Sequence, residues 1–162
     1  MKALSIRQPW AWAILHAGKR IENRDWRGAP SYRGPLLIHA AKGCTRDEYE
    51  EGLISIFVAK RSLGQASGPL SNAASIGAPP LALMQRGGIV GVCDIVDVIN
   101  RGAYVSKAYP ANEAHRIESP WFFGPVGLVL DNVRPLPFVP FAGALGFFDV
   151  PDALVPAATV RP

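Results

Sequence analysis

A run of β-branched residues at 89–99, IVGVCDIVDVI, limits most strongly what this chain can fold into. β-Branched side chains are stiff and pack well on a pleated surface, so the run predicts a central strand of a sheet. Regular alternation would place every second side chain of the run on one face of that sheet. The side chains expected on that face are Val90, Val92, Asp94 and Val96.

Other segments supply further strands. They are LSIR at 4–7, PLLIHAAK at 35–42, VGLVLDNVRPL at 126–136 and GALGFFDVP at 143–151. Proline has no backbone N–H to give to a neighbouring strand. Pro135, Pro137 and Pro140 therefore predict that the chain there is an edge strand or a crossing.

Two helices are expected between these strands. Pro9 suits the first turn of a helix, where its missing N–H costs nothing, and Gly18 suits the end of that helix. Thr45 is followed three residues later by Glu48, which is the pattern of a capping box and opens a second helix.

The stretch 64–88 is different in composition from the rest of the chain. It is rich in Gly, Ala, Ser and Pro, and it predicts a long flexible surface loop, either a lid or an inserted segment. The whole chain, 1–162, is then one domain of the α+β class. Its expected form is a small, mostly antiparallel β-barrel with flanking helices.

Charge and cysteine content narrow the choice of function only slightly. A net charge of +4 and a pI near 9.3 favour phosphate-bearing partners, although many proteins with this charge bind no polyanion. Cys44 and Cys93 have neither zinc-site spacing nor the pattern of a disulfide scaffold. Neither a signal-peptide segment nor an apolar run of roughly 20 residues occurs, so we expect a cytoplasmic protein that does not enter membranes.

The segment AGKRIENRDWR at 17–27 concentrates charge in a chain that is 19% charged. Alternation along it puts Glu22 and Arg24 on one face of a strand. Such a pair supplies a general base beside a phosphate clamp, or else it is an exposed salt bridge of little weight. Lys19 follows the helix end and is either a base, nucleophile or phosphate ligand or a solvated surface lysine. Lys19 and Glu22 are the catalytic candidates.

Aromatic residues accompany these cations. Trp10 and Trp26 lie close in sequence to several arginines, and rings beside cations are what single-stranded nucleic acid requires. Trp121 stands in the turn ESPWFFGPVG at 118–127 and is expected to line a cleft, although at least two of the four tryptophans should belong to the core. The candidate binding residues are Gln8, Trp10, Gly18, Arg24, Trp26, Arg33 and Trp121.

Signatures of other chemistry are missing from the sequence. The three histidines lack metal-ligand spacing, and His39, inside an apolar strand, is interpreted as a core residue. No glycine-rich phosphate loop or nucleophile elbow occurs. The apolar surroundings of Cys93 favour an inert thiol. No metal site or cofactor is evident, and a loosely bound divalent metal is left open.

Several segments together resemble a known family. They are LSIRQPWAWAILHAGKRIENRDWR at 4–27, YRGPLLIHAAK at 32–42, GGIVGVCDIVDV at 87–98 and PWFFGPVGLVLDNVRPL at 120–136. With them the chain resembles an ASCH-domain protein of the PUA-like superfamily, from Leu4 to about Pro151 apart from 64–88. The most specific part is a G-x-K-x-x-E-x-R element, which matches Gly18, Lys19, Glu22 and Arg24.

The resemblance implies a small β-barrel with flanking helices and a cleft between the barrel and the first helix. ASCH domains are proposed to bind RNA or modified nucleosides there, and some members resemble single-strand ribonucleases. Others remove the acetyl group of N4-acetylcytidine with a lysine, a threonine three positions later and a distant glutamate. Lys19 matches the lysine, but Glu22 stands in place of the threonine, and Asp94 and Glu118 are the candidates for the distant acid.

Three functions remain open at this point. The first is binding of RNA or a modified nucleoside in a basic, aromatic-lined cleft, with single-stranded RNA as the first choice and ribonuclease activity as a further step. The second is an amidohydrolase that acts on an N4-acylated cytidine nucleoside. The third is a non-catalytic module that binds a protein through the apolar segment 136–148. The sequence settles neither catalysis nor the oligomeric state.

Overall fold

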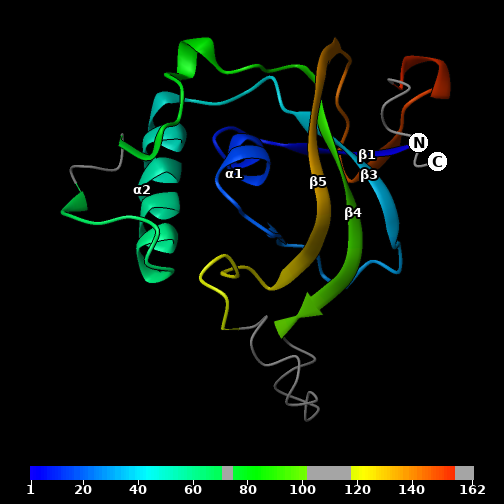
Figure 1. Ribbon diagram of the computed structural model, residues 1–162. Helices are drawn as coiled ribbons and strands as arrows, with labels where there is room; N and C mark the ends of the chain where they lie inside the picture. The colour runs from blue at the N-terminus through cyan, green and yellow to red at the C-terminus, as the bar shows by residue number, and fades with distance from the viewer. Residues whose placement is uncertain (71–74, 102–117, 156–162) are drawn as a thin grey trace.

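The chain folds into a curved sheet with two helices on one side (Figure 1). The structure is a computed structural model, and it describes residues 1–70, 75–101 and 118–155. The strands are β1 (Lys2–Ile6), β2 (Ile21–Arg24), β3 (Gly34–Ala40), β4 (Gly88–Asn100), β5 (Val126–Pro140) and β6 (Phe147–Asp149). The helices are α1 (Trp10–His16) and α2 (Arg46–Ser62), with short 3-10 turns at Leu81–Leu83 and Asp152–Leu154.

The six strands form one mixed sheet in the order β2-β5-β4-β3-β1-β6. β1 and β3 run parallel, and the other neighbouring pairs are antiparallel. The expected α+β class is confirmed, but the closed barrel is not, because β2 and β6 end the sheet within the described residues. β6 is too short to close it, since it pairs only with Lys2–Leu4 of β1.

The regular alternation expected along β4 is wrong. The pairing of β4 with β5 shifts register at three places, after Ile89, Val92 and Ile95. The shift after Ile95 places one extra residue on β4, and so does the shift in the pairing of β3 with β4 between Ile38 and His39. An extra residue in one strand turns its following side chains to the other face. Val90 and Val92 consequently enter different apolar clusters, and Val96 is 47% exposed.

The prolines of β5 lie where the sequence predicted an edge. β2 pairs only with the stretch Val126–Val129 of β5, so among the described strands the later half of β5 has β4 as its one neighbour. Pro135 and Pro140 face Gly91 and Gly88 of β4 there. An edge tolerates proline because its missing N–H would have pointed away from the sheet.

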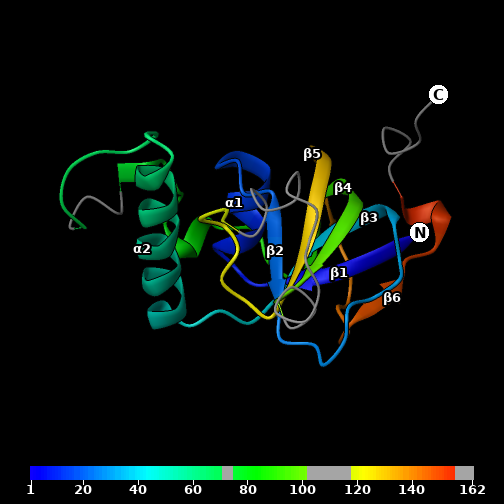
Figure 2. The same cartoon turned by 90° about the horizontal axis from the view of Figure 1, so that it is seen from below.

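Helix α1 lies between the sheet and α2 in both ribbon views (Figures 1 and 2). Ala11 and Ile14 of α1 pack into the main core against the strands, whereas Ala13 and Ala17 pack with Ile56 of α2. The small alanines let the two helices approach closely. At the same contact, a Cβ on Gly52 of α2 would lie 2.5 Å from Cδ of Pro9, so only glycine is accommodated.

The start of α2 confirms the predicted capping box. The Thr45 hydroxyl accepts a hydrogen bond from the backbone N–H of Glu48, and the Glu48 carboxylate accepts one from the backbone N–H of Thr45. Together these bonds satisfy two N–H groups that a helix start otherwise leaves without partners.

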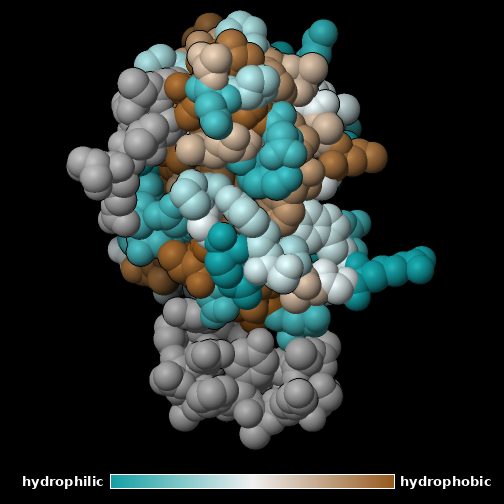
Figure 3. All heavy atoms as spheres, turned by 90° about the vertical axis from the view of Figure 1, so that its right-hand side faces the viewer, coloured by the Kyte–Doolittle hydropathy of each residue, from teal (hydrophilic) through white to brown (hydrophobic). Residues whose placement is uncertain are grey.

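The described parts of 64–88 lie against α2. Met84 is buried in an apolar cluster with Leu53 and Phe57 of the helix, and the Tyr49 hydroxyl donates to the carbonyl of Pro79 over 2.7 Å. The flexibility expected of this segment remains a prediction. Neither described helix has the length and apolar content needed to cross a membrane. On the face away from α2, hydrophobic side chains occur in small groups between hydrophilic ones (Figure 3).

Candidate functional site

The junction between α1 and β2 sets the position of the site. Ala17 is the C-cap of α1, and Gly18 follows it with φ +75°, a left-handed conformation that favours glycine. The backbone N–H of Lys19 then donates back to the carbonyl of Ala13 over 3.1 Å. This turn leads the chain directly into β2 and keeps the backbone of Lys19 in contact with α1.

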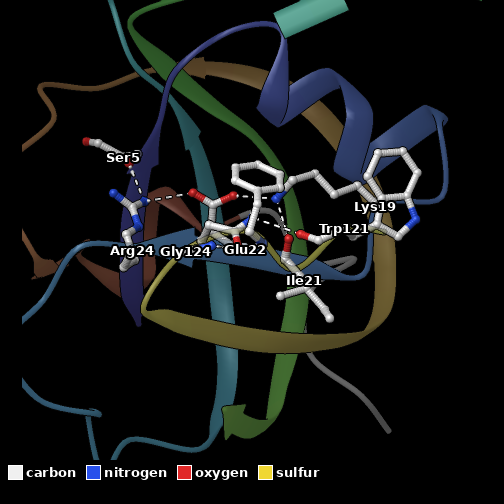
Figure 4. A network of polar contacts seen from close by, with 9 residues as sticks. Ser5, Lys19, Ile21, Glu22, Arg24, Trp121 and Gly124 are labelled. Carbon is white, nitrogen blue, oxygen red and sulfur yellow. Dashed lines mark hydrogen bonds and ion pairs between the residues drawn. The ribbon is translucent and has the colours of Figure 1, made fainter. Parts of the chain in front are cut away.

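Three charged side chains meet at β2. Nζ of Lys19 lies 2.8 Å from Oε2 of Glu22, and Oε1 of the same carboxylate lies 3.4 Å from Arg24. Figure 4 shows the Glu22 carboxylate between the two cations. The Lys19 side chain is 1% exposed and that of Glu22 is 9% exposed. One carboxylate therefore lies between two cations and balances the charge of one of them, which leaves the group of three with one net positive charge.

Burial changes the chemistry of Lys19. It lowers the pKa of this lysine, because removal from water disfavours the ammonium form, and the nearby Glu22 carboxylate opposes the shift. Nζ also donates to the backbone carbonyl of Ile21, and it lies 5.6 Å from the ring centroid of Trp10. Lys19 is thus held from three sides.

Arg24 joins two strands that are not neighbours in the sheet. Its guanidinium donates over 2.7 Å to the carbonyl of Ser5 in β1, beyond the stretch of β1 that pairs with β6. It also lies 5.7 Å from the ring centroid of Trp26. Nε of Arg24 is buried without a hydrogen-bond partner in the described part of the chain.

Glu22 and Arg24 line a cleft of about 1110 Å³. Its charged lining residues are Arg7, Glu22, Arg24, Asp25 and Lys42. Trp10 contributes an aromatic ring to the lining. Ser5, His39 and the segment 141–146 also line the cleft. Three cations against two carboxylates give the cleft a small positive balance.

Comparison with known proteins identifies the family. A family model for the ASCH domain matches residues 4–134. The chain belongs to the ASCH-domain family. No curated protein matches it.

The cleft of this ASCH domain gathers only part of the predicted site. Trp10, Glu22 and Arg24 line it, and Lys19 lies behind Glu22 without lining it. Gly18 acts through the backbone turn described above. Trp26 lies beside the cleft through its contact with Arg24.

Other predicted residues lie elsewhere. Gln8 lines a separate cavity of about 400 Å³, where its side chain is bonded to the backbone of Trp12 and Gln85. Arg33 is paired with Asp97 over 3.5 Å, and neither residue lines the cleft.

Trp121 corrects an expectation. It is 4% exposed and packs in the core cluster between α1 and α2 instead of lining the cleft. Hydrogen bonds with Asn23 of β2 stabilise its turn. Nδ2 of Asn23 donates to the Trp121 carbonyl over 2.8 Å. Oδ1 of Asn23 accepts from the backbone N–H groups of Phe123 and Gly124, each over 3.0 Å. The Pro-Gly pattern of the turn favoured a ring that lines a cleft, but the tertiary contacts place the ring in the core.

The candidates for a distant acid do not reach the cleft either. Asp94 accepts a hydrogen bond from Asn132 over 2.6 Å on the sheet, and Glu118 is exposed. Neither lines the cleft, whereas Asp25 does. Within the described ranges, no three His, Cys, Asp or Glu side chains are grouped closely enough to hold a metal ion.

The interpretation of His39 as a core residue is confirmed, since it is 1% exposed and both ring nitrogens are hydrogen-bonded. Its place in the cleft lining, and the roles of Ser5 and Asn23, were missed from the sequence. Asn23 stands next to Glu22 in the charged segment, and its role depends on a turn about a hundred residues away. Ser5 and His39 come from two different strands. No local pattern connects them, because only the pairing of β1 with β3 brings them together.

Proposed function

We propose that the cleft of this ASCH domain binds a nucleotide segment of single-stranded RNA. The observation that carries the proposal is the Glu22 carboxylate, held in place by Lys19 and Arg24 on the wall that also contains Trp10. A fixed carboxylate accepts hydrogen bonds from the amino group of a base, and an indole ring provides a stacking surface.

The charge and size of the cleft support a strand in preference to a free nucleoside. Arg7 and Lys42 line the cleft outside the Lys19–Glu22–Arg24 group and can meet phosphates. A volume of about 1110 Å³ exceeds the range typical of small-molecule pockets, roughly 300 to 1,000 Å³. A nucleotide chain fills such an open cleft better than one nucleoside does.

Catalysis at this site would depend on Glu22. Glu22 lines the cleft, while Nζ of Lys19 is occupied by the Ile21 carbonyl and by Glu22 itself. Strand cleavage would use Glu22 to take the 2′-hydroxyl proton, and Lys19 would be a positioning residue. Arg24 would meet the charge that develops on the phosphate.

A second candidate function, removal of an N4-acyl group from cytidine, is favoured by one observation. The lowered pKa of Lys19 beside a carboxylate is the kind of perturbed pair that occurs in active sites. In that reaction Glu22 would activate water against the acyl carbonyl. The protein-interaction alternative has less support, because Leu136 is buried, and Phe141 and Phe148 pack against the core cluster.

The test is binding of a fluorescent single-stranded RNA, measured by anisotropy at several salt concentrations. We expect binding that weakens with salt, and a clear further loss in Arg24→Gln and Glu22→Gln. Arg33→Gln is the matched control, because it removes one positive charge outside the cleft. Equal losses in Arg24→Gln and Arg33→Gln, or no binding by the folded wild type, would overturn the proposal.

The same samples test catalysis. RNA and N4-acetylcytidine are incubated with wild type and with Glu22→Gln, each with and without EDTA, and products are read by gel and chromatography. Cleavage of RNA that Glu22→Gln abolishes would add a ribonuclease step to the binding function. Release of acetate from N4-acetylcytidine would favour the second candidate, and loss of either activity with EDTA would reveal a required metal.

A further inference from the structure

Ser5 and His39 form a hydrogen-bonded pair on the wall of the cleft. They are register partners in the parallel pairing of β1 with β3, and both line the cleft. Oγ of Ser5 lies 3.1 Å from Nδ1 of His39. His39 itself is 1% exposed, so its ring is shielded from bulk water while the serine lies at the cleft surface.

The hydrogen bonds determine which nitrogen of His39 carries the proton. Nε2 lies 3.0 Å from the backbone carbonyl oxygen of Phe141, and a carbonyl oxygen can only accept. Nε2 of the neutral ring therefore carries the hydrogen, which leaves Nδ1 as an acceptor. The Ser5 hydroxyl consequently donates to Nδ1. A hydroxyl, a base that accepts its proton and a third group that orients the base are the parts of an activated nucleophile.

Neighbouring groups fix this pair in place. The backbone carbonyl of Ser5 accepts from Arg24 over 2.7 Å, and the ring of Phe148 lies edge-on to His39 at 5.7 Å between centroids. Gly143 packs against the pair, since a Cβ there would lie 2.6 Å from both Oγ of Ser5 and Cε1 of His39. A larger residue at position 143 would clash with both side chains.

We propose that Ser5 is a nucleophile and His39 its general base for acyl transfer from a carboxylic ester bound in the cleft. Oγ of Ser5 forms a bond to the ester carbonyl carbon, and its proton passes to Nδ1 of His39. The bond from that carbon to the alcohol oxygen then breaks, and the alcohol leaves with the proton from Nδ1. Water repeats the two steps on the acyl-serine, which releases the carboxylic acid and restores Ser5.

The substrate class follows from the position of the pair. Ser5 and His39 share the cleft with Trp10, Glu22 and Arg24, so the ester is one whose alcohol part is a nucleoside hydroxyl. This substrate class rests on the proposed function, whereas the reactivity of Ser5 does not. A buried histidine with both nitrogens bonded is also what a purely structural residue shows. The two roles differ in whether Ser5 reacts.

The first experiment measures that reaction directly. The folded full-length protein is treated with a fluorophosphonate probe and with p-nitrophenyl acetate, and the modified residue is located by mass spectrometry. We expect modification of Ser5 in wild type, none in Ser5→Ala, and a rate lower by about 100-fold or more in His39→Gln. Ser55→Ala is the matched control, because Ser55 is an exposed serine on α2 that donates to the carbonyl of Glu51.

Each outcome is decisive. Modification of Ser5 that Ser5→Ala removes and Ser55→Ala leaves intact supports the proposal. No modification of Ser5 in protein with a wild-type circular dichroism spectrum and unfolding transition overturns it, and so does labelling at another serine alone. Ser5→Ala removes a single atom, so it also keeps the test valid where His39→Gln fails to fold.

A second experiment separates the substrate class from the proposed RNA function. Hydrolysis of 3′-O-acetyluridine is compared with that of p-nitrophenyl acetate, and RNA binding is measured on the same protein. Hydrolysis of the nucleoside ester through Ser5 supports the full proposal. Reaction with p-nitrophenyl acetate alone overturns the substrate class and leaves the nucleophile in place. If Ser5 of the wild-type protein reacts but the protein does not bind RNA, the result counts against the proposed function only.

Discussion

Nζ of Lys19 lies 2.8 Å from Oε2 of Glu22, and the two side chains are among the few buried charged groups of the described chain. Removal of Lys19 leaves the Glu22 carboxylate buried with Arg24, at 3.4 Å, as its remaining cation. We therefore expect Lys19→Met to lower the free energy of unfolding by about 2 to 3 kcal/mol, the cost of a lost hydrogen bond to a buried charged group, measured by urea denaturation.

The double variant Lys19→Met/Glu22→Leu provides the control for that prediction. It removes both charges together, so we expect it to be more stable than Lys19→Met alone. Arg24 keeps a partner in the Ser5 carbonyl in either case. Lys19→Met as stable as wild type would contradict the account of the buried pair. So would a double variant whose loss of unfolding free energy equals the sum of the losses in Lys19→Met and Glu22→Leu.

The pH dependence of stability should report the same lysine. Burial lowers the pKa of Lys19 from its ordinary value of 10.5, so the unfolded chain holds this proton more tightly than the folded one. As pH rises through the folded pKa toward 10.5, the penalty for the buried ammonium group is relieved. We expect wild type to gain stability relative to Lys19→Met between neutral pH and pH 10.5, in paired denaturation curves. A constant difference across that range would show that burial does not perturb this amine.

Trp10 and Trp12 offer a matched pair for testing base stacking. Trp10 lines the large cleft, whereas Trp12 lines the smaller cavity next to Gln8. One stacked base contributes about 1 to 3 kcal/mol, so Trp10→Leu should weaken RNA binding roughly 5- to 150-fold. We expect a much smaller change in Trp12→Leu, measured by anisotropy at fixed salt. A larger effect of Trp12→Leu than of Trp10→Leu would indicate that RNA binds at the smaller cavity instead of the cleft.

Asn23 should control the turn that contains Trp121. Its side chain makes three hydrogen bonds to backbone groups of that turn. Asn23→Ala should lower the free energy of unfolding by about 2 to 3 kcal/mol, because those backbone groups lose their partner. Asn23→Asp keeps the acceptor and loses the donor, so a smaller loss is expected. Unfolding monitored by tryptophan fluorescence measures both, and equal stability of Asn23→Ala and wild type would show that other contacts hold the turn.

The two cysteines should differ sharply in reactivity. Burial raises the pKa of Cys93 to about 12, with Asp94 adding to the shift, so this thiol stays protonated at neutral pH. Cys44 is partly exposed, and burial raises its pKa as well. At pH 8, iodoacetamide should alkylate Cys44 slowly, and Cys93 only after unfolding, as followed by intact mass. Alkylation of both thiols at the same rate in the native protein would contradict this difference.

Several features could be predicted from the sequence because they depend on neighbours along the chain. The capping box of Thr45 and Glu48 needs residues three positions apart, and Gly18 ends α1 through its own backbone conformation. Glu22 and Arg24 share a face because side chains in a strand alternate. The edge position of the prolines in β5 followed from their missing N–H groups.

The side-chain orientations along β4 and the position of Trp121 could not be predicted from the sequence. The alternation expected for Val92 and Val96 fails because extra residues of β4 arise in its pairing with β3 and β5, and no residue of β4 alone signals them. Trp121 stands in a turn with the composition of an exposed loop, yet Asn23 and the two helices enclose it. In both cases partners distant in sequence decided the outcome.

The sequence by itself determined the strands and helices, the order in which they follow one another and the charged element that begins β2, since these depend on local periodicity, capping and turn chemistry. Only the tertiary structure decided that Lys19 is buried behind Glu22, that Arg24 reaches Ser5, and that Ser5 meets His39. The physical reason is that burial and hydrogen bonding between strands depend on how the sheet curves and in which register its strands pair, and these are set by contacts made across the whole fold at once.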